Sequence, residues 1–319
     1  MPNDLVSVVI PTYNKGKFIV ETLDSVLHQT YENIEVLLVD NGSTDDTRAR
    51  IDEYLNSCPG NYRVIDLVEN KGPSNARNVG ILEAKGKYVF LLDGDDLLMP
   101  EKIGQQVHYM DANLEVGLSL TPYLIYSATR KVSTRLVSEV NPNRLIQGWI
   151  GMSNFGGLVE STGCIRRANL DSTLLFDLSL MGSEGLDFTI KWHDRFPVGV
   201  LREPLTLYRI SSDGLHYDLL AINENMIRVT NRYISHQSEK AKLLAQQDAF
   251  FRLDKIRYES IFIIISYLSR ALIALDTPII KMTCWIITRN VKSAFFGMLY
   301  RGKIRALLDS LSSCESDLH

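Results

Sequence analysis

Short apolar runs alternate with amphipathic segments over the first hundred residues of the chain. The runs are uninterrupted and rich in β-branched side chains, which is typical of strands buried on both faces of a parallel sheet. They predict strands at residues 6–10, 34–39, 63–68 and 88–92. Apolar side chains at helical spacing predict helices at residues 18–27, from about 45, at 74–84 and at 101–112. This alternation predicts a doubly wound α/β domain with right-handed connections.

The pattern is less regular after residue 112. It predicts a strand over residues 116–126, a helix over 185–193 and a strand over 198–207. Residues 128–147 are polar and weakly patterned, so we expect a loop there, and a largely helical stretch is expected at 223–257.

Polar clusters follow three of the predicted strands. They are Pro11-Thr12-Tyr13-Asn14, Asp40-Asn41-Gly42 and Asp93-Gly94-Asp95. Ligands of open α/β sheets bind at the carboxyl ends of the strands. We therefore expect these three clusters to meet at one edge of the sheet.

Composition excludes some classes of protein. The chain has 319 residues, of which 45% are hydrophobic and 23% charged, as in ordinary globular proteins. A net charge of -4 does not suggest a nucleic-acid-binding protein. Its four cysteines lie far apart, and the first residues lack a signal-peptide pattern, so a cytoplasmic protein with reduced thiols is expected.

Positive charge is concentrated near the C-terminus. Residues 240–305 include twelve Lys or Arg and four Asp or Glu, a net charge of +8. Apolar and basic side chains at helical spacing in residues 279–300 are typical of a helix lying in a membrane interface. Residues 254–305 could therefore contact a membrane peripherally, at its cytoplasmic face, where anionic lipids attract basic residues. Alternatively, these helices pack on the main domain.

The acidic turn Asp93-Gly94-Asp95-Asp96 suits a divalent cation. Three carboxylates within four residues repel one another unless a cation joins them, and Gly94 lets the backbone approach a ligand closely. A bridging Mn²⁺ or Mg²⁺ held by Asp93 and Asp95 could neutralise the diphosphate of a nucleotide. Otherwise the turn is a solvated loop or a helix cap.

Other side chains near the predicted edge suit a nucleotide. Asp40 could accept the ring N–H of a uracil or guanine, or could simply close a turn. Thr12, Tyr13 and Asn14 supply a hydroxyl, a ring for stacking and an amide. Arg77 could face phosphate or base, or pair with a neighbouring acid.

The chain lacks the motifs of several other nucleotide-binding and hydrolytic classes. No GxGxxG follows the first strand, and neither a P-loop motif nor a GxSxG elbow is present. These absences argue against a dinucleotide-dependent dehydrogenase, a P-loop NTPase and an α/β-hydrolase. A nucleotidyltransferase would need a Gly-rich basic loop where Pro11-Thr12-Tyr13-Asn14 stands.

Four blocks of the sequence, in order, resemble the family 2 glycosyltransferases of the GT-A fold. The blocks are VSVVIPTYN at residues 6–14, QTY through VDNGSTDDT at 29–47, NKG with ARNVG at 70–80, and LDGDD at 92–96. The resemblance covers about residues 5–210. It implies a mixed, mostly parallel GT-A sheet flanked by helices, formed by residues 1–215, with 1–100 as the nucleotide-binding half and 101–215 as the acceptor half. Residues 216–319 would be a helical, basic extension.

The resemblance also implies roles for individual residues. Asp93 and Asp95 would bind the metal. The donor would contact Pro11, Thr12, Tyr13, Asn14, Asp40, Gly42, Arg77, Asp93 and Gly94. The implied function is inverting transfer of a sugar from a UDP- or GDP-sugar to an acceptor hydroxyl. That acceptor would be a glycan or lipid-linked glycan of surface polysaccharide biosynthesis.

The acceptor-side block departs from the family at one position. The family typically has Glu-Asp there, with the Asp as general base, whereas this chain has Glu184-Gly185. Glu184 or Asp187 could act as the base instead. Alternatively, the chain binds nucleotide-sugars without transferring them, or Gly185 cripples an otherwise active enzyme.

Overall fold

The computed structural model describes most of the first 209 residues and a few beyond them. These are residues 3–58, 60–127, 130–135, 160–180, 182–209, 225, 228–229 and 231–233. The chain divides into two compact units, Met1–Lys240 and Ala241–His319, and all described residues lie in the first. Residues 254–305, for which membrane contact is predicted, lie outside the described residues, as does most of the helical stretch predicted at 223–257.

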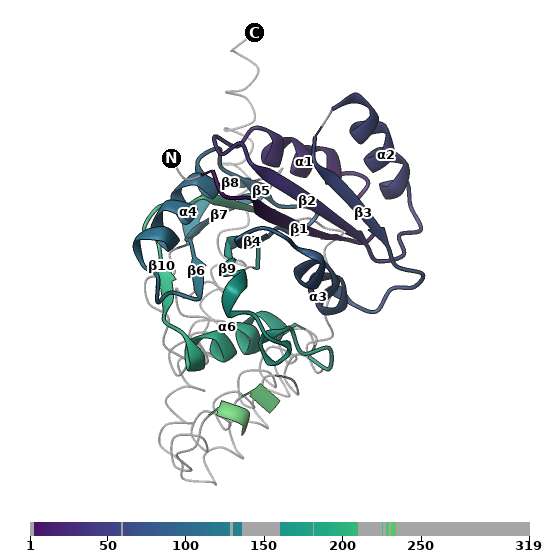
Figure 1. The fold of residues 1–319 in the computed structure, drawn as a ribbon. Helices are drawn as coiled ribbons and strands as arrows, with labels where there is room; N and C mark the ends of the chain where they lie inside the picture. Colours follow the sequence, from purple (N-terminus) through teal and green to yellow (C-terminus); the bar gives the residue numbers. More distant parts are fainter. Residues whose placement is uncertain are drawn as a thin grey trace, which may run out of the picture. The chain divides into compact units, whose positions relative to one another are not determined.

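A seven-stranded sheet forms the centre of the first unit, in the order β10-β6-β9-β4-β1-β2-β3 (Figure 1). Its strands are β1 (Val6–Thr12), β2 (Ile34–Asp40), β3 (Tyr62–Asp66), β4 (Tyr88–Leu91), β6 (Leu118–Leu120), β9 (Cys164–Arg166) and β10 (Val198–Val200). Strand β1 is parallel to both β2 and β4, and β2 is parallel to β3. Only β9, among these strands, runs antiparallel to its neighbours β4 and β6. The predicted mixed, mostly parallel sheet is confirmed.

Helices pack on both faces of this sheet (Figure 1). Successive residues of β1 are apolar and point to opposite faces, so each face offers an apolar surface to helices. The helices are α1 (Ile19–Leu27), α2 (Thr47–Ser57), α3 (Pro73–Glu83), α4 (Lys102–Ala112) and α6 (Glu184–Arg195). Val8 and Ile10 join an apolar cluster that includes side chains of α1, α2 and α4. Val9, on the other face, joins a cluster with α3 and α6. Helix α3 lies so close that a Cβ on Gly80 would be 2.3 Å from Cγ1 of Val9.

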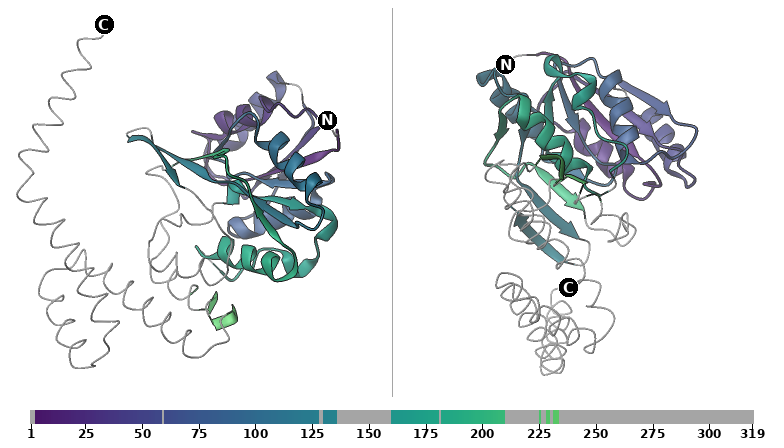
Figure 2. Two further views of the ribbon diagram at one scale, coloured as in Figure 1. Left: turned by 90° about the vertical axis from the view of Figure 1, so that its left-hand side faces the viewer. Right: turned by 90° about the horizontal axis from the view of Figure 1, so that it is seen from below.

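A smaller sheet of four strands, in the order β5-β11-β7-β8, completes the described fold. Its members are β5 (Leu97–Leu98), β7 (Tyr123–Ser127), β8 (Arg130–Arg135) and β11 (Thr206–Arg209). Figure 2 shows the β7–β8 hairpin projecting from the helix-flanked sheet. The described residues between β8 and α6 include three short 3₁₀ helices, η1 (Glu160–Thr162), η2 (Arg167–Asn169) and η3 (Ser172–Leu174).

Three predictions for the second half of the domain were wrong. The strand expected over 116–126 is broken at Thr121–Pro122, because proline has no N–H for a ladder, and its parts join different sheets. The strand expected over 198–207 is likewise divided into β10 and β11. Part of the loop expected at 128–147 is strand β8, which pairs with β7. The pairing uses backbone groups, so it leaves no apolar pattern in the polar sequence of β8.

Candidate functional site

The ends of β1 and β2 lie side by side, with Thr12 and Asp40 as register partners. Both side chains are buried. Oδ1 of Asp40 accepts hydrogen bonds from the backbone N–H and the hydroxyl of Ser43, at 3.1 and 2.5 Å, so it closes the turn after β2. Gly42 has φ of +75° in that turn, which favours glycine. Buried Oγ1 of Thr12 has no hydrogen-bond partner among the described residues.

Asn14 stabilises the neighbouring loop. It has a left-handed backbone with φ of +52°, and its Oδ1 accepts the backbone N–H of Thr44 at 2.8 Å. Neither Ser43 nor Thr44 caps helix α2, which begins after Asp46 without a side-chain cap. Those two hydroxyls bond Asp40 and Asn14 instead. Tyr13 projects more freely, with 36% of its surface exposed.

The acidic turn after β4 lies beside the end of β1. A Cβ on Gly94 would be 3.3 Å from the carbonyl oxygen of Pro11 and 3.4 Å from Cβ of Thr12. The side chains of Asp93 and Asp95 are 25% and 15% exposed, so neither points freely into solvent. The three polar clusters therefore meet at one edge of the sheet, as predicted.

Two cations face this acidic turn. Arg77, from α3, donates from Nη2 to both carboxylate oxygens of Asp93 at 2.8 and 2.9 Å, and Lys15 pairs with Asp95. The guanidinium of Arg77 is buried, and it also lies 3.8 Å from Glu160 and 3.7 Å from Glu184. Burial opposes its charge, but the surrounding carboxylates raise the pKa of Arg77 above its ordinary value.

Glu160 is a site residue that the sequence interpretation missed. It lies at the start of η1, and its side chain is 16% exposed. Burial raises the pKa of this carboxyl to about 7; Arg77 opposes the rise, whereas Asp93 and Glu184 add to it. Its sequence surroundings are small and polar without periodicity, and a glutamate there gives no local signal of burial.

Glu184 and Asp187 lie in the first turn of α6 but contact different partners. Glu184 faces Arg77, whereas Asp187 is fully buried and accepts from Nη1 of Arg232 at 2.5 Å and from the hydroxyl of Tyr233 at 2.9 Å. Nζ of Lys191 lies 2.8 Å from the other oxygen of Asp187. The carboxylate of Asp187 thus ties α6 to residues 232–233.

Asp96, which the sequence interpretation treated only as part of the acidic turn, is completely buried. Its carboxylate accepts from the hydroxyl of Ser161 at 2.5 Å and from the backbone N–H of Arg209 at 2.9 Å. Ser161 also accepts the backbone N–H of Asp93 at 3.0 Å. Burial, followed by the charges of Asp95 and Asp93, raises the pKa of Asp96 well above its ordinary value. These bonds fix the acidic turn to η1 and β11.

The carboxylates of the turn fit a divalent cation only in part. No group of three His, Cys, Asp or Glu able to hold a metal ion occurs among the described residues. Asp93 and Asp95 could supply two hard oxygen donors. Mg²⁺ and similar cations are commonly held by one or two carboxylates together with substrate phosphates and water. The residues therefore suit a cation that binds together with a phosphate ligand.

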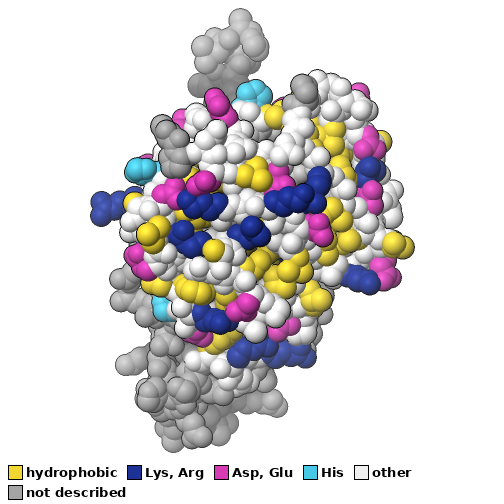
Figure 3. Space-filling model, viewed as in Figure 1, with side chains coloured by type: hydrophobic (Ala, Val, Ile, Leu, Met, Phe, Trp, Pro, Cys, Tyr) yellow, Lys and Arg dark blue, Asp and Glu magenta, His cyan; other side chains and the backbone are white. Residues whose placement is uncertain are grey.

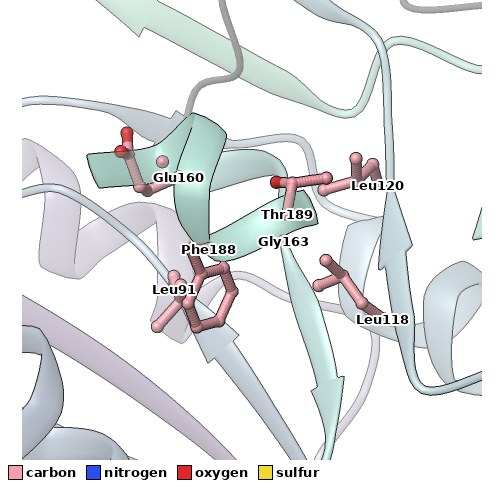
Figure 4. Close-up of a pocket in the computed structure, with 8 residues that line it drawn as sticks. Leu91, Leu118, Leu120, Glu160, Gly163, Phe188 and Thr189 are labelled. Carbon is pink, nitrogen blue, oxygen red and sulfur yellow. The ribbon is translucent and has the colours of Figure 1, made fainter. Parts of the chain in front are cut away.

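A small, mostly apolar pocket lies next to this cluster. Glu160 and Gly185 line it, together with Leu91, Leu118, Leu120, Gly163, Phe188 and Thr189. In Figure 4 the carboxylate of Glu160 lies at one end of the pocket, and Leu118 and Leu120 lie at the other. A group entering here would meet one carboxylate in otherwise apolar surroundings.

The described surface carries charges of both signs. Figure 3 shows basic and acidic side chains interspersed on the face viewed there. Within the part of the chain that the structure describes, no helix is long and apolar enough to cross a bilayer.

Curated relatives share the N-terminal part of the chain. GlyG, a glycosyltransferase of Streptococcus pneumoniae, is 41% identical over 118 residues, which are 36% of this chain and 39% of GlyG. WfaP of Escherichia coli, a UDP-Glc:alpha-D-GlcNAc-diphosphoundecaprenol beta-1,3-glucosyltransferase, is 40% identical over 124 residues, 38% of this chain and 47% of WfaP. The chain thus spans less than half the length of either relative.

Solved structures share the fold more widely. TarS 1-349 of S. aureus in complex with UDP has a TM-score of 0.57 and 25% identity, covering 76% of this chain and 70% of that one. The mannosyltransferase PcManGT of Pyrobaculum calidifontis, in complex with GDP-Man and Mn²⁺, has a TM-score of 0.56 at 18% identity. It covers 91% of this chain and 86% of its own, and at this identity it supports the GT-A fold alone.

The model of the family described as "Glycosyl transferase family 2" matches residues 7–167, half of the chain. That range includes β1, β2, the acidic turn and Glu160. The chain belongs to glycosyl transferase family 2.

Proposed function

We propose that this protein transfers a sugar from a nucleotide donor, UDP- or GDP-linked, to a hydroxyl of an acceptor. The supporting observation is the meeting of Thr12, Asp40 and the acidic turn at one edge of the sheet, with Arg77 behind the turn. Such an edge offers polar groups for a base and a ribose beside carboxylates for a phosphate-bound cation.

The nucleoside would lie over the ends of β1 and β2. The buried hydroxyl of Thr12, without a partner among the described residues, is free to bond a ligand. Asp40 uses Oδ1 in its turn, which leaves the second carboxylate oxygen to accept a ring N–H. The half-exposed ring of Tyr13 could stack on the base. Pro11, Gly42 and Gly94 allow the ligand to approach the backbone.

Asp93 and Asp95 would hold a Mn²⁺ or Mg²⁺ ion, which would neutralise the charge of the departing diphosphate. Arg77 keeps Asp93 oriented and adds a fixed positive charge near the leaving group. Lys15, which pairs with Asp95, contributes a second positive charge there.

The acceptor would be a glycan or a lipid-linked glycan of surface polysaccharide biosynthesis. Support comes from WfaP, a glucosyltransferase whose acceptor is a diphosphoundecaprenol-linked sugar, and from GgaA of Bacillus subtilis, a minor teichoic acid biosynthesis protein. GgaA is 28% identical over 189 residues, 54% of this chain and 40% of GgaA. The acceptor half contains the carboxylates that could take the proton of the hydroxyl, among them Glu184 and Asp187.

A screen of nucleotide-sugars tests the proposal. Purified full-length protein is titrated with UDP-glucose, UDP-GlcNAc and GDP-mannose, with Mn²⁺ or with EDTA, and thermal unfolding and nucleoside diphosphate release are measured. Binding of one donor raises the unfolding temperature, because ligands stabilise the state that binds them. Asp95→Asn should lose the increase that depends on Mn²⁺. Affinity unchanged by both Mn²⁺ and this substitution would refute the metal site, and the lack of any donor binding would refute the function.

A donor-binding protein that transfers nothing is the second candidate, favoured by Gly185 at the position expected for the general base. Nucleoside diphosphate release by the unmodified protein separates the two. Sustained release with a synthetic lipid-linked α-GlcNAc diphosphate, or with water, as the acceptor would exclude a silent protein.

We also propose that residues 254–305 hold the protein at the cytoplasmic face of the membrane. The support is the net charge of +8 over residues 240–305, since basic residues near a surface are attracted by anionic lipids. The test is co-flotation of full-length protein with vesicles of phosphatidylglycerol or of phosphatidylcholine alone. Flotation with anionic vesicles, reversed by salt, is expected. Equal recovery with both vesicle types would contradict an electrostatic contact.

A further inference from the structure

Gly185 and Glu160 occupy one small region of the site. A Cβ built on Gly185 would be 2.4 Å from Oε1 of Glu160 and 3.0 Å from its Cδ. Real Cβ atoms do not approach so closely, so any larger side chain at 185 would have to displace the carboxylate. The space beside the first turn of α6 is therefore filled by a carboxylate that comes from η1, 25 residues earlier in the sequence.

The carboxylate of Glu160 belongs to the same ion cluster as the acidic turn. Arg77 contacts Asp93 at 2.8 Å and Glu160 at 3.8 Å through the same nitrogen, Nη2. One guanidinium thus donates hydrogen bonds to a proposed metal ligand and lies within ion-pair distance of Glu160. A cation and diphosphate at Asp93 would place the sugar within reach of this cluster.

We propose that Glu160 is the general base of the transfer reaction and that Gly185 is the residue that makes room for it. This proposal rests on the proposed function. In the reaction, Glu160 takes the proton of the acceptor hydroxyl, whose oxygen forms a bond to the anomeric carbon. The bond between that carbon and the diphosphate oxygen breaks, and the nucleoside diphosphate leaves with the electron pair.

The other two candidate carboxylates are less available to an acceptor. Asp187 is completely buried. Its Oδ1 accepts hydrogen bonds from Arg232 and Tyr233, and its Oδ2 lies 2.8 Å from the ammonium group of Lys191. The side chain of Glu184 is 5% exposed, against 16% for Glu160. Glu160 also lines the pocket, whose other residues are mostly apolar, and such surroundings disfavour the ionised form and make the carboxylate a stronger base.

Substitutions at the two positions test the proposal with the full-length protein, Mn²⁺ and whichever nucleotide-sugar of the screen it binds. Nucleoside diphosphate release is measured with water and with a synthetic lipid-linked α-GlcNAc diphosphate as acceptors, and donor affinity is measured by calorimetry. Glu160→Gln should reduce kcat by about 100-fold or more, as expected for a lost general base. Donor affinity should stay the same or rise slightly, since one negative charge near the diphosphate is removed. Glu203→Gln, on the surface, is the matched control.

A double variant separates catalysis from packing. Gly185→Asp alone should not raise turnover, because its Cβ would push the carboxylate of Glu160 out of the position from which it acts. The double variant Glu160→Ala with Gly185→Asp removes the collision and returns a carboxylate to the same space. Its kcat should therefore be at least about tenfold higher than that of Glu160→Ala.

Three outcomes would overturn the inference. They are full activity of Glu160→Gln, loss of its donor affinity together with its turnover, and failure of the folded double variant to exceed Glu160→Ala. Loss of turnover in Glu184→Gln with retention in Glu160→Gln would assign the base to Glu184. If the unmodified protein binds no donor at all, the proposed function has failed, and that result is distinct from each of these.

Discussion

Replacing Glu160 with glutamine should make the folded protein more stable at alkaline pH. The carboxyl has a pKa of about 7 in the folded chain, against 4.5 for an ordinary glutamate. One pKa unit corresponds to about 1.4 kcal/mol, so ionised Glu160 costs the folded state about 3 kcal/mol. Burial is the main cause, and Asp93 and Glu184 add to it, while Arg77 compensates only in part. Glutamine resembles the protonated acid and avoids this cost.

The sign of the pH dependence follows from proton binding. Below about pH 4.5 Glu160 is protonated in both the folded and unfolded states, so it contributes nothing to stability. Between about pH 4.5 and 7 only the folded state keeps the proton, and the free energy of unfolding falls by up to about 1.4 kcal/mol per pH unit. Above about pH 7 the whole cost is present. The glutamine variant lacks this decline.

Urea unfolding at 25 °C in EDTA, followed by tryptophan fluorescence at several pH values, measures the effect. The free energies of unfolding of Glu160→Gln and the unmodified protein should be close at pH 4.5 and should differ by about 3 kcal/mol at pH 8, in favour of the variant. Glu203→Gln, on the surface, should show no such divergence. A constant difference across the pH range, or a less stable glutamine variant at pH 8, would refute the reasoning.

Two further substitutions probe the frame of the site. Asp96→Ala leaves the Ser161 hydroxyl and the Arg209 N–H without their acceptor. Urea unfolding at pH 8 should therefore show a free energy of unfolding lower by about 2–5 kcal/mol. A decrease of less than about 1 kcal/mol would argue against this link. Gly80→Ala places a methyl group 2.3 Å from Val9, and the same measurement should give a loss of about 1–3 kcal/mol from overpacking. An unchanged or higher stability would mean that α3 shifts without cost.

The sequence was sufficient to predict the fold of the first hundred residues. Strands β1, β2 and β4 are buried on both faces, so their sequences are nearly continuous apolar runs, whereas the edge strand β3 is only partly buried. Residues at the carboxyl ends of parallel strands meet at one edge of the sheet, whatever their separation in sequence. Thr12, Asp40 and the Asp93 turn were therefore predicted to lie together, and they do. The roles assigned to them as donor and metal ligands remain predictions.

The described residues after about position 100 could not be predicted as well, because their fold depends on contacts between distant segments. Its strands are only a few residues long, and β6 and β7, although adjacent in sequence, pair in different sheets. Glu160 lies in a stretch without periodicity and reaches Arg77, 83 positions earlier, only after folding. Gly185 indicated that the carboxylate expected at this position is missing. The sequence could not indicate that Glu160, from η1, occupies the same space.

The hidden carboxylate of Asp96 joins three segments that are far apart along the chain, at positions 96, 161 and 209. Hydrogen bonds to this buried carboxylate therefore hold these three segments together inside the protein. A change in the length of the chain between these positions would leave the three segments joined at Asp96.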